Sequence, residues 1–209
     1  MKIKICGLSR EEDVKVVNDV LPDYIGFVLV PGSRRYVSYE HAQKLKEKLS
    51  EKILTVGVFA DEKPEMIACM AGKGIIDLIQ LHGNEEVNDI ETLKRMCGIP
   101  VIKAVSMTAK GYREIIKRFE ESSVDYLLLD SGKGGSGHMF DHRCISGIKK
   151  PYFLAGGLTS ENIREVLDDV PVMPYAVDIS SGVETEGRKD KEKIKQKSTL
   201  DQRPASQIN

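Results

Sequence analysis

The sequence predicts an α/β protein folded as a single (β/α)8 barrel, the TIM barrel. Eight short runs rich in Val, Ile, Leu and Tyr recur along the 209-residue chain, and amphipathic segments of helical length lie between most of them. Strand, crossover and strand in series form a parallel sheet, and eight such units close into this barrel. An open, doubly wound sheet is the alternative, because periodicity does not show closure. The absence of a GxGxxG motif after the first run makes dinucleotide binding less favoured.

The predicted strands are residues 2–6, 24–30, 53–59, 77–81, 100–105, 125–129, 151–155 and 175–179. In the first strand Lys and Ile alternate up to Cys6, as in a short β-strand, and Ser9 with Glu12 has capping-box spacing for a helix that begins just after. The predicted helices are residues 9–20, 38–50, 64–73, 85–96, 109–121 and 160–169, several of which open on Ser, Pro or an acidic residue. A weaker, almost wholly polar candidate covers 188–197.

The chain length indicates one domain, which we place at residues 1–197. Residues 198–209 lack apolar periodicity and are predicted to form a disordered tail.

Charge and composition favour a small-molecule partner. The net charge is −1, so the sequence carries no electrostatic footprint for nucleic acid or for an anionic membrane. Charged residues such as Lys2, Lys4 and Arg10 interrupt the first twenty positions, which predicts neither a secretory signal nor a membrane anchor, and we expect a cytoplasmic protein. The four cysteines have no CxxC spacing, so we expect free thiols.

If the fold is a barrel, the residues at the carboxyl ends of its strands are the chemical ones. Cys6 and Gly7 lie where the first strand meets a loop, a position at which a nucleophile or base would face a ligand; the alternative is that Cys6 is a small buried hydrophobe. Asp130 ends the sixth run, before a loop containing Gly134 to Gly137. A buried carboxylate needs a partner, and the alternative is a helix cap or turn-forming aspartate.

Two loops predict a phosphate site. AGGL follows the seventh strand and DISSGVET the eighth, and in such barrels the loops after these strands bind phosphate through backbone amides and helix N-termini. The alternative is a pair of tight turns that need glycine. The substrate-binding residues expected here are Gly156, Gly157, Asp178, Ser180, Ser181 and Gly182. By themselves, Arg34 and Arg35 resemble solvated surface charges and His82 a structural hydrogen-bonding residue.

Taken together, KICG, PGSRRYVS, VGVF, QLHG, LLLD, GGSGHMFD, AGGL and DISSGVE resemble the phosphoribosylanthranilate isomerase family, from residue 2 to about residue 190. The resemblance implies an Amadori rearrangement of N-(5-phosphoribosyl)anthranilate in tryptophan biosynthesis, with no metal or organic cofactor and with a monomer or homodimer as the assembly. It places the general base on Cys6 and the general acid on Asp130. It also implies that Arg35 meets the anthranilate carboxylate, while Gln80 and His82 line the pocket.

The acid and base roles set expectations for two pKa values. We expect a nearby cation or helix N-terminus to lower the pKa of Cys6, and burial or the substrate phosphate to raise that of Asp130. One position departs from the family pattern GGxGxxFDW: His142 stands where the tryptophan is usual.

Two rival hypotheses remain, one for another enzyme and one for a non-catalytic protein. Another phosphosugar barrel, such as an aminoaldose isomerase of histidine biosynthesis or a ribulose-phosphate epimerase, would place a carboxylate or a metal-binding histidine at the position of Cys6. A non-catalytic sensor of phosphate ligands would need only the phosphate loops, without Cys6, Asp130 and Arg35.

Overall fold

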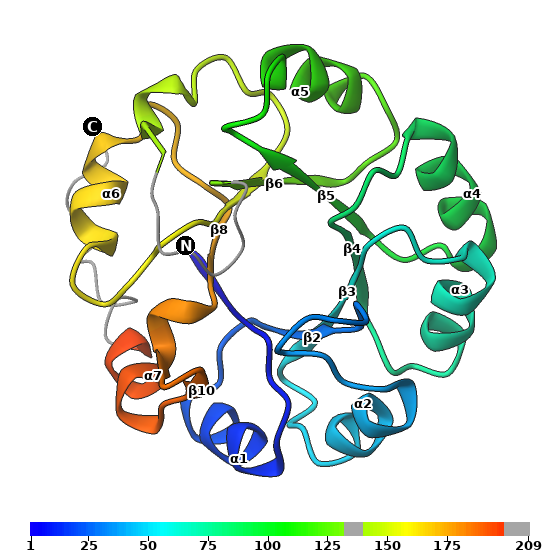
Figure 1. Cartoon of the computed structure of the whole chain (residues 1–209), viewed down its shortest axis with the longest axis vertical. Coiled ribbons are helices and arrows are strands. Elements are labelled where there is room, and N and C mark those ends of the chain that lie inside the picture. The colour runs from blue at the N-terminus through cyan, green and yellow to red at the C-terminus, as the bar shows by residue number, and fades with distance from the viewer. Residues whose placement is uncertain (132–139, 199–209) are drawn as a thin grey trace.

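The computed structural model describes residues 1–131 and 140–198, with backbone alone for residues 197 and 198. Eight parallel strands form a closed barrel in the order of the chain, with helices around the outside (Figure 1). The strands are β1 (Lys2–Cys6), β2 (Tyr24–Val28), β3 (Leu54–Phe59), β4 (Leu78–Leu81), β5 (Val101–Ser106), β6 (Tyr126–Asp130), β7 (Tyr152–Leu154) and β8 (Ala176–Ile179). The predicted fold class is confirmed, and the open sheet is excluded because β1 pairs with β8.

The helices lie close to their predicted positions. They are α1 (Glu11–Val20), α2 (Tyr39–Lys46), α3 (Pro64–Gly72), α4 (Val87–Cys97), α5 (Tyr112–Glu120), α6 (Ile163–Asp169) and α7 (Lys191–Ser198). Two short 3-10 helices, η1 (His142–Cys144) and η2 (Ser181–Val183), follow β6 and β8.

Two details of the sequence prediction are wrong. The carboxylate that caps α1 belongs to Asp13 rather than Glu12, and it accepts from the backbone N–H groups of Ser9 and Arg10 at 3.0 and 3.1 Å. Residues 188–189 start no helix: they form strand β10 (Arg188–Lys189), which pairs antiparallel with β9 (Glu184–Thr185). The predicted domain boundary falls within the last turn of α7, and residues 199–209 of the predicted tail lie outside the described residues.

Side chains of the barrel strands alternate between two cores. Outward-facing residues such as Ile5, Ile25 and Phe27 pack under the helices in the larger hydrophobic cluster. Inward-facing residues form a smaller cluster inside the barrel. At its amino end Phe153 contacts the rings of Tyr24, Tyr126 and Tyr175, with centroids 5.6 to 5.7 Å apart. The barrel is therefore filled below the carboxyl ends of its strands, where the remaining space lies.

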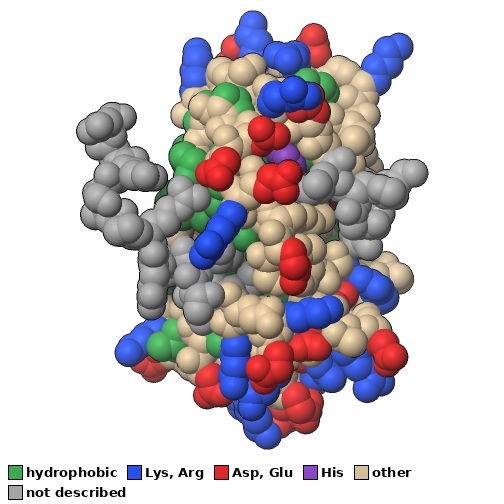
Figure 2. Space-filling view, turned by 90° about the vertical axis from the view of Figure 1, so that its left-hand side faces the viewer, with side chains coloured by type: hydrophobic (Ala, Val, Ile, Leu, Met, Phe, Trp, Pro, Cys, Tyr) green, Lys and Arg blue, Asp and Glu red, His purple; other side chains and the backbone are tan. Residues whose placement is uncertain are grey.

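The surface agrees with the small net charge. Acidic and basic side chains are interspersed over the face shown in Figure 2. Among the described residues, no helix is long and apolar enough to cross a membrane.

Candidate active site

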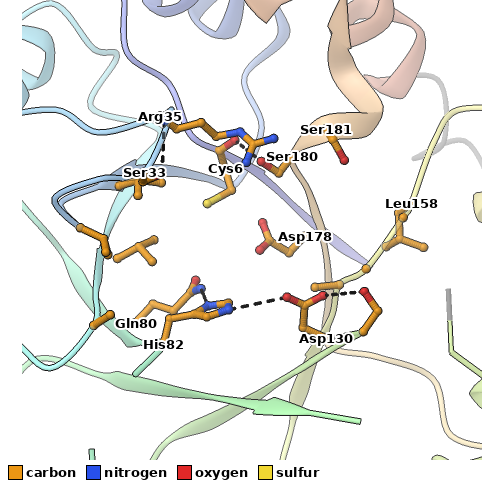
Figure 3. A pocket seen from close by; sticks show the side chains of 18 residues that line it. Cys6, Ser33, Arg35, Gln80, His82, Asp130, Leu158, Asp178, Ser180 and Ser181 are labelled. Atoms are coloured by element: carbon orange, nitrogen blue, oxygen red, sulfur yellow. Dashed lines mark hydrogen bonds and ion pairs between the residues drawn. The ribbon is translucent and has the colours of Figure 1, made fainter. Parts of the chain in front are cut away.

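A cavity of about 370 Å³ opens at the carboxyl ends of the barrel strands, a size typical of small-molecule sites. Figure 3 shows Cys6, Arg35 and the serines of the β8 loop on one side, His82 and Asp130 on the other, and Asp178 between them. The predicted residues that line the cavity are Cys6, Arg35, Gln80, His82, Asp130, Gly156, Gly157, Asp178, Ser180 and Ser181. Gly182 is the predicted site residue that does not line it.

Cys6 is the last residue of β1, and its side chain points into the cavity (Figure 3). Gly26, its register partner on β2, leaves room for the sulfur, because a Cβ there would lie 2.7 Å from Cys6 Sγ. Burial raises the pKa of the Cys6 thiol and outweighs the opposing effect of the Lys4 and Lys189 ammonium groups. The expectation of a lowered pKa is therefore wrong, and this site holds Cys6 as a thiol at neutral pH.

Gly7 has a separate structural reason to follow Cys6. Its φ of +86° is in the left-handed region, and a Cβ on it would lie 2.4 Å from Cδ of Arg35. The Arg35 side chain thus lies directly across the Gly7 backbone. The sequence Cys6-Gly7 therefore places a thiol and an arginine side by side at the cavity.

Lys4 lies two residues before Cys6 on the same inward face of β1, and it is a residue of the site that was not predicted from the sequence. Its side chain is completely buried, and Nζ donates to Asp178 Oδ1 on β8 at 2.9 Å. Burial acts to lower the pKa of Lys4, but the charge and hydrogen bond of Asp178 together with those of Cys6 outweigh it, so the pKa is raised and the ammonium group stays charged. The β8 loop adds a further contact, as Ser180 Oγ donates to the Cys6 carbonyl at 3.1 Å.

Asp130 ends β6 and belongs to a chain of polar groups with β4. His82 Nε2 lies 3.6 Å from Asp130 Oδ2, and Gln80 Nε2 lies 3.0 Å from His82 Nδ1. Since the amide nitrogen donates to Nδ1, the proton of a neutral His82 lies on Nε2, which faces Asp130. Gln80 Oε1 is buried and has no hydrogen-bond partner among the described residues.

Burial acts to raise the pKa of Asp130, but its hydrogen bond and charge interaction with His82 and its bonds to Ser131 outweigh burial, so the pKa is lowered. The expectation that burial raises it is wrong for this site, in which Asp130 is a carboxylate at neutral pH.

The loops after β7 and β8 border the cavity together, as the phosphate-site prediction requires. Gly156 and Gly157 both have positive φ, at +94° and +67°. Gly182 is packed so tightly that a Cβ would lie 1.8 Å from the Leu158 carbonyl oxygen. It therefore holds the two loops together and does not line the cavity itself.

Arg35 is neither free nor solvated: it is 12 % exposed and bonded to Glu184 through Nε at 2.6 Å and Nη2 at 2.9 Å. Glu184 also accepts from Lys189 Nζ at 2.8 Å. Neither Glu184 nor Lys189 was predicted as a site residue. The only signal in the sequence was the opposite charge of Glu184 and the arginine pair, and charge alone does not show which residues meet.

Two further predictions concern the segment after β6. The loop glycines Gly134, Gly135 and Gly137, with Ser136, lie outside the described residues. His142 is buried in η1 and its ring packs against Phe140 with centroids 4.7 Å apart, so a buried ring is kept where the family usually has tryptophan. All four cysteines are free thiols, as predicted.

Fold and site together define a class: a (β/α)8-barrel enzyme with a thiol and a carboxylate on opposite walls of one cavity, beside two glycine-containing loops. Residues 3–198 match the family model of N-(5'-phosphoribosyl)anthranilate (PRA) isomerase. The chain belongs to the PRA isomerase family.

Curated relatives and solved structures agree with this assignment. An N-(5'-phosphoribosyl)anthranilate isomerase of Lachnoclostridium phytofermentans is 41% identical over 94% of this chain and 95% of its own length. One from Endomicrobium trichonymphae is 43% identical over 92% and 94%. The crystal structure of phosphoribosyl anthranilate isomerase from Thermotoga maritima has a TM-score of 0.83 at 36% identity, covering 94% of this chain and 96% of that one. A crystal structure of phosphoribosyl anthranilate isomerase in complex with reduced 1-(o-carboxyphenylamino)-1-deoxyribulose 5-phosphate has a TM-score of 0.82 at 34% identity. It covers 95% of this chain and 97% of that one.

Proposed function

We propose that this chain catalyses the rearrangement after which its family is named, with Cys6 as general base and Asp130 as general acid. N-(5-Phosphoribosyl)anthranilate is converted to 1-(2-carboxyphenylamino)-1-deoxyribulose 5-phosphate, a step of tryptophan biosynthesis. The observation that carries this proposal is the placement of Cys6 on β1 and Asp130 on β6, facing one cavity that the β7 and β8 loops border. A sugar held between them meets an acid on one side and a base on the other.

The chemistry assigns one proton transfer to each residue. Asp130, once protonated, gives its proton to the ribose ring oxygen as the C1–O bond breaks and the amine lone pair forms the C1 iminium. The Cys6 thiolate then removes the C2 proton, and that electron pair forms the enolamine double bond. The C2 hydroxyl then loses its proton to solvent, and C1 gains a proton. This gives the ketone. The reaction leaves Cys6 as a thiol and Asp130 as a carboxylate. Cys6 must therefore lose a proton and Asp130 must gain one before the next turnover.

Neighbouring groups are placed to assist these two proton transfers. Lys4 carries a buried positive charge on the same face of β1 as Cys6, which favours the thiolate when it forms. His82 Nε2 faces Asp130, so His82 is placed to return a proton to that carboxylate. Gln80 Nε2 lies 3.0 Å from His82 Nδ1 and so orients the ring of His82 toward Asp130.

Different parts of the cavity would bind the two ends of the substrate, its phosphate and its anthranilate group. The β7 and β8 loops, with Gly156, Gly157, Ser180 and Ser181, would hold the phosphate through backbone amides and hydroxyls. Arg35 would meet the anthranilate carboxylate. A phosphorylated small molecule is thus the partner, and the assembly stays a prediction of monomer or homodimer.

The activity is tested by forming the unstable substrate in the cuvette and following the loss of its anthranilate fluorescence. Purified protein should accelerate the loss well above the spontaneous background. Cys6→Ala and Asp130→Asn should each lower kcat by about 10²–10⁴-fold with little change in KM, because each acts in the transition state. Loss no faster than background with the unaltered protein would contradict the function. Near-native kcat in Cys6→Ala would make the cysteine a packing residue.

A further inference from the structure

Glu184 is a buried carboxylate bonded to Arg35, a residue that lines the cavity, and the mechanism above does not use it. Its side chain is 5 % exposed and accepts hydrogen bonds from three cations. Arg35 donates to it twice, at 2.6 and 2.9 Å, Arg34 Nη2 once at 2.8 Å, and Lys189 Nζ once at 2.8 Å. A carboxylate this buried and this fully bonded fixes the groups around it.

A small β-ribbon places Glu184 where it is. Glu184 on β9 is the register partner of Lys189 on β10, and Lys189 Nζ also donates to the Ser180 carbonyl at 2.9 Å. The ribbon is therefore tied to the β8 loop that borders the cavity. Through Glu184 it reaches across to Arg35 in the loop after β2, far away in the sequence.

The way Glu184 holds Arg35 leaves the other edge of the guanidinium available. Glu184 takes the edge formed by Nε and Nη2, and the two N–H groups of Nη1 and one of Nη2 remain. These remaining donors form the second fork of the planar group, which matches a carboxylate. Arg35 lines the cavity, and Figure 3 shows its guanidinium above Cys6 and next to Ser180.

The net charge around Arg35 favours an anion even when the Glu184 carboxylate is counted. Arg34, Arg35 and Lys189 bring three positive charges to one carboxylate, so two remain in excess. Gly7 closes the other side of the Arg35 side chain, because a Cβ there would overlap Cδ at 2.4 Å. Arg35 is thus fixed from two sides, and its orientation is set before a ligand arrives.

We propose that Glu184 is a positioning residue which, by fixing Arg35, gives the enzyme its preference for a substrate whose amine carries an ortho carboxylate. This proposal rests on the proposed function, in which Arg35 meets that carboxylate. Removing the charge of Glu184 should release Arg35 to other rotamers and weaken recognition of the carboxylate. It should leave the proton transfers by Cys6 and Asp130 in place.

The test compares two substrates that differ only in that carboxylate. Ribose 5-phosphate condenses with anthranilate to give the proposed substrate, and with aniline to give the same glycosylamine without the carboxylate. The quantity measured is the ratio of kcat/KM for the two, in the unaltered protein, in Glu184→Gln and in a control. Asp77→Asn is the matched control: this carboxylate accepts from Lys46 at 2.8 Å and from Thr55, and it precedes β4 at the opposite end of the barrel.

Glu184→Gln should lower kcat/KM for the anthranilate substrate by about tenfold to a hundredfold, mainly through KM, as expected for loss of a buried charged partner. The aniline substrate should change by less than about threefold, so the preference collapses. Asp77→Asn should keep the preference of the unaltered protein.

Each other outcome overturns one specific claim. If the unaltered protein rearranges neither substrate, the proposed function fails. If it prefers the anthranilate substrate and Glu184→Gln keeps that preference, the positioning role is wrong. If Glu184→Gln loses both substrates in equal proportion, Glu184 acts only on folding or on the proton transfers, and the role in specificity is wrong again.

Discussion

Among single residues, Cys6 and Asp130 hold the one proton of their pair in the opposite way from what the proposed mechanism needs. Burial raises the pKa of the thiol, while His82 and the Ser131 bonds outweigh burial and lower that of the carboxylate. The productive form, a thiolate with a carboxylic acid, has the same total charge as the resting form. It is therefore a minor form whose share does not change with pH as long as the pair holds one proton.

The pH dependence of the reaction follows from this arrangement. Between about pH 7 and 8.5, below the pKa of the buried thiol, kcat/KM should be flat. As pH rises through the Cys6 pKa, kcat/KM should fall, because the pair loses the proton that Asp130 must donate. The rate of Cys6 alkylation by iodoacetamide should rise over the same range, because alkylation needs only the thiolate. Measuring both rates on one preparation is decisive. A kcat/KM that rises in parallel with alkylation would show that Asp130 is not the acid.

On the level of elements, contacts between loops hold the loop residues that line the cavity beside its strand-end residues. The loops after β7 and β8 touch each other at Gly182, and those after β2 and β8 meet through Arg35 and Glu184. The ribbon β9–β10 supplies Glu184 and Lys189, although residues 188 and 189 were predicted to begin a helix. Its strands have two residues each, too few for an alternating pattern to appear in the sequence.

Gly182 provides a test of the proposal that the loops after β7 and β8 bind phosphate. Gly182→Val would force the Leu158 carbonyl away, because even a Cβ would approach it to 1.8 Å. The KM for the phosphorylated substrate should rise by about 10²-fold, and inhibition by inorganic phosphate should weaken in proportion. Gly72→Val is the control, since a Cβ there meets nothing within 4 Å. An unchanged KM in a folded Gly182→Val protein would show that phosphate binds elsewhere.

For the molecule as a whole, closure of the barrel and construction of the site depend on the same contact. Strand β1 pairs with β8, and Lys4 and Asp178 are register partners at that seam. Their ion pair is buried in the barrel, with side chains 0% and 8% exposed. Removing one partner leaves a buried charge uncompensated, whereas removing both does not.

From this ion pair we predict that substitutions of Lys4 and Asp178 have non-additive effects on stability. Lys4→Met alone should lower the free energy of unfolding by about 3–5 kcal/mol, because the Asp178 charge is left unpaired. The double variant Lys4→Met with Asp178→Asn should recover a large part of that loss. Urea unfolding followed by circular dichroism measures both. Equal destabilisation by the single and the double variant would show that the ion pair is not what matters at the seam.

The sequence by itself determined the barrel, its eight strands and the strand-end residues of the site. Periodicity of apolar residues reports which segments are strands and helices, because every such segment must bury one face. In a parallel barrel the carboxyl ends of all strands meet on one side. This is why the positions of Cys6 and Asp130 at strand ends were enough to assign them to one cavity, although they lie 124 positions apart in the chain.

Only the tertiary structure decided which charged groups pair with each other. The Lys4 that alternates with isoleucine in the first strand faces the barrel interior and Asp178, and Arg35 is held by Glu184 from a ribbon 149 residues later. The pKa values of Cys6 and Asp130 likewise depend on burial and on neighbouring groups: burial dominates for Cys6, whereas His82 and Ser131 outweigh burial for Asp130. The physical reason is that apolar burial depends on a local, periodic pattern, whereas charge pairing depends on distances of a few ångström between distant segments.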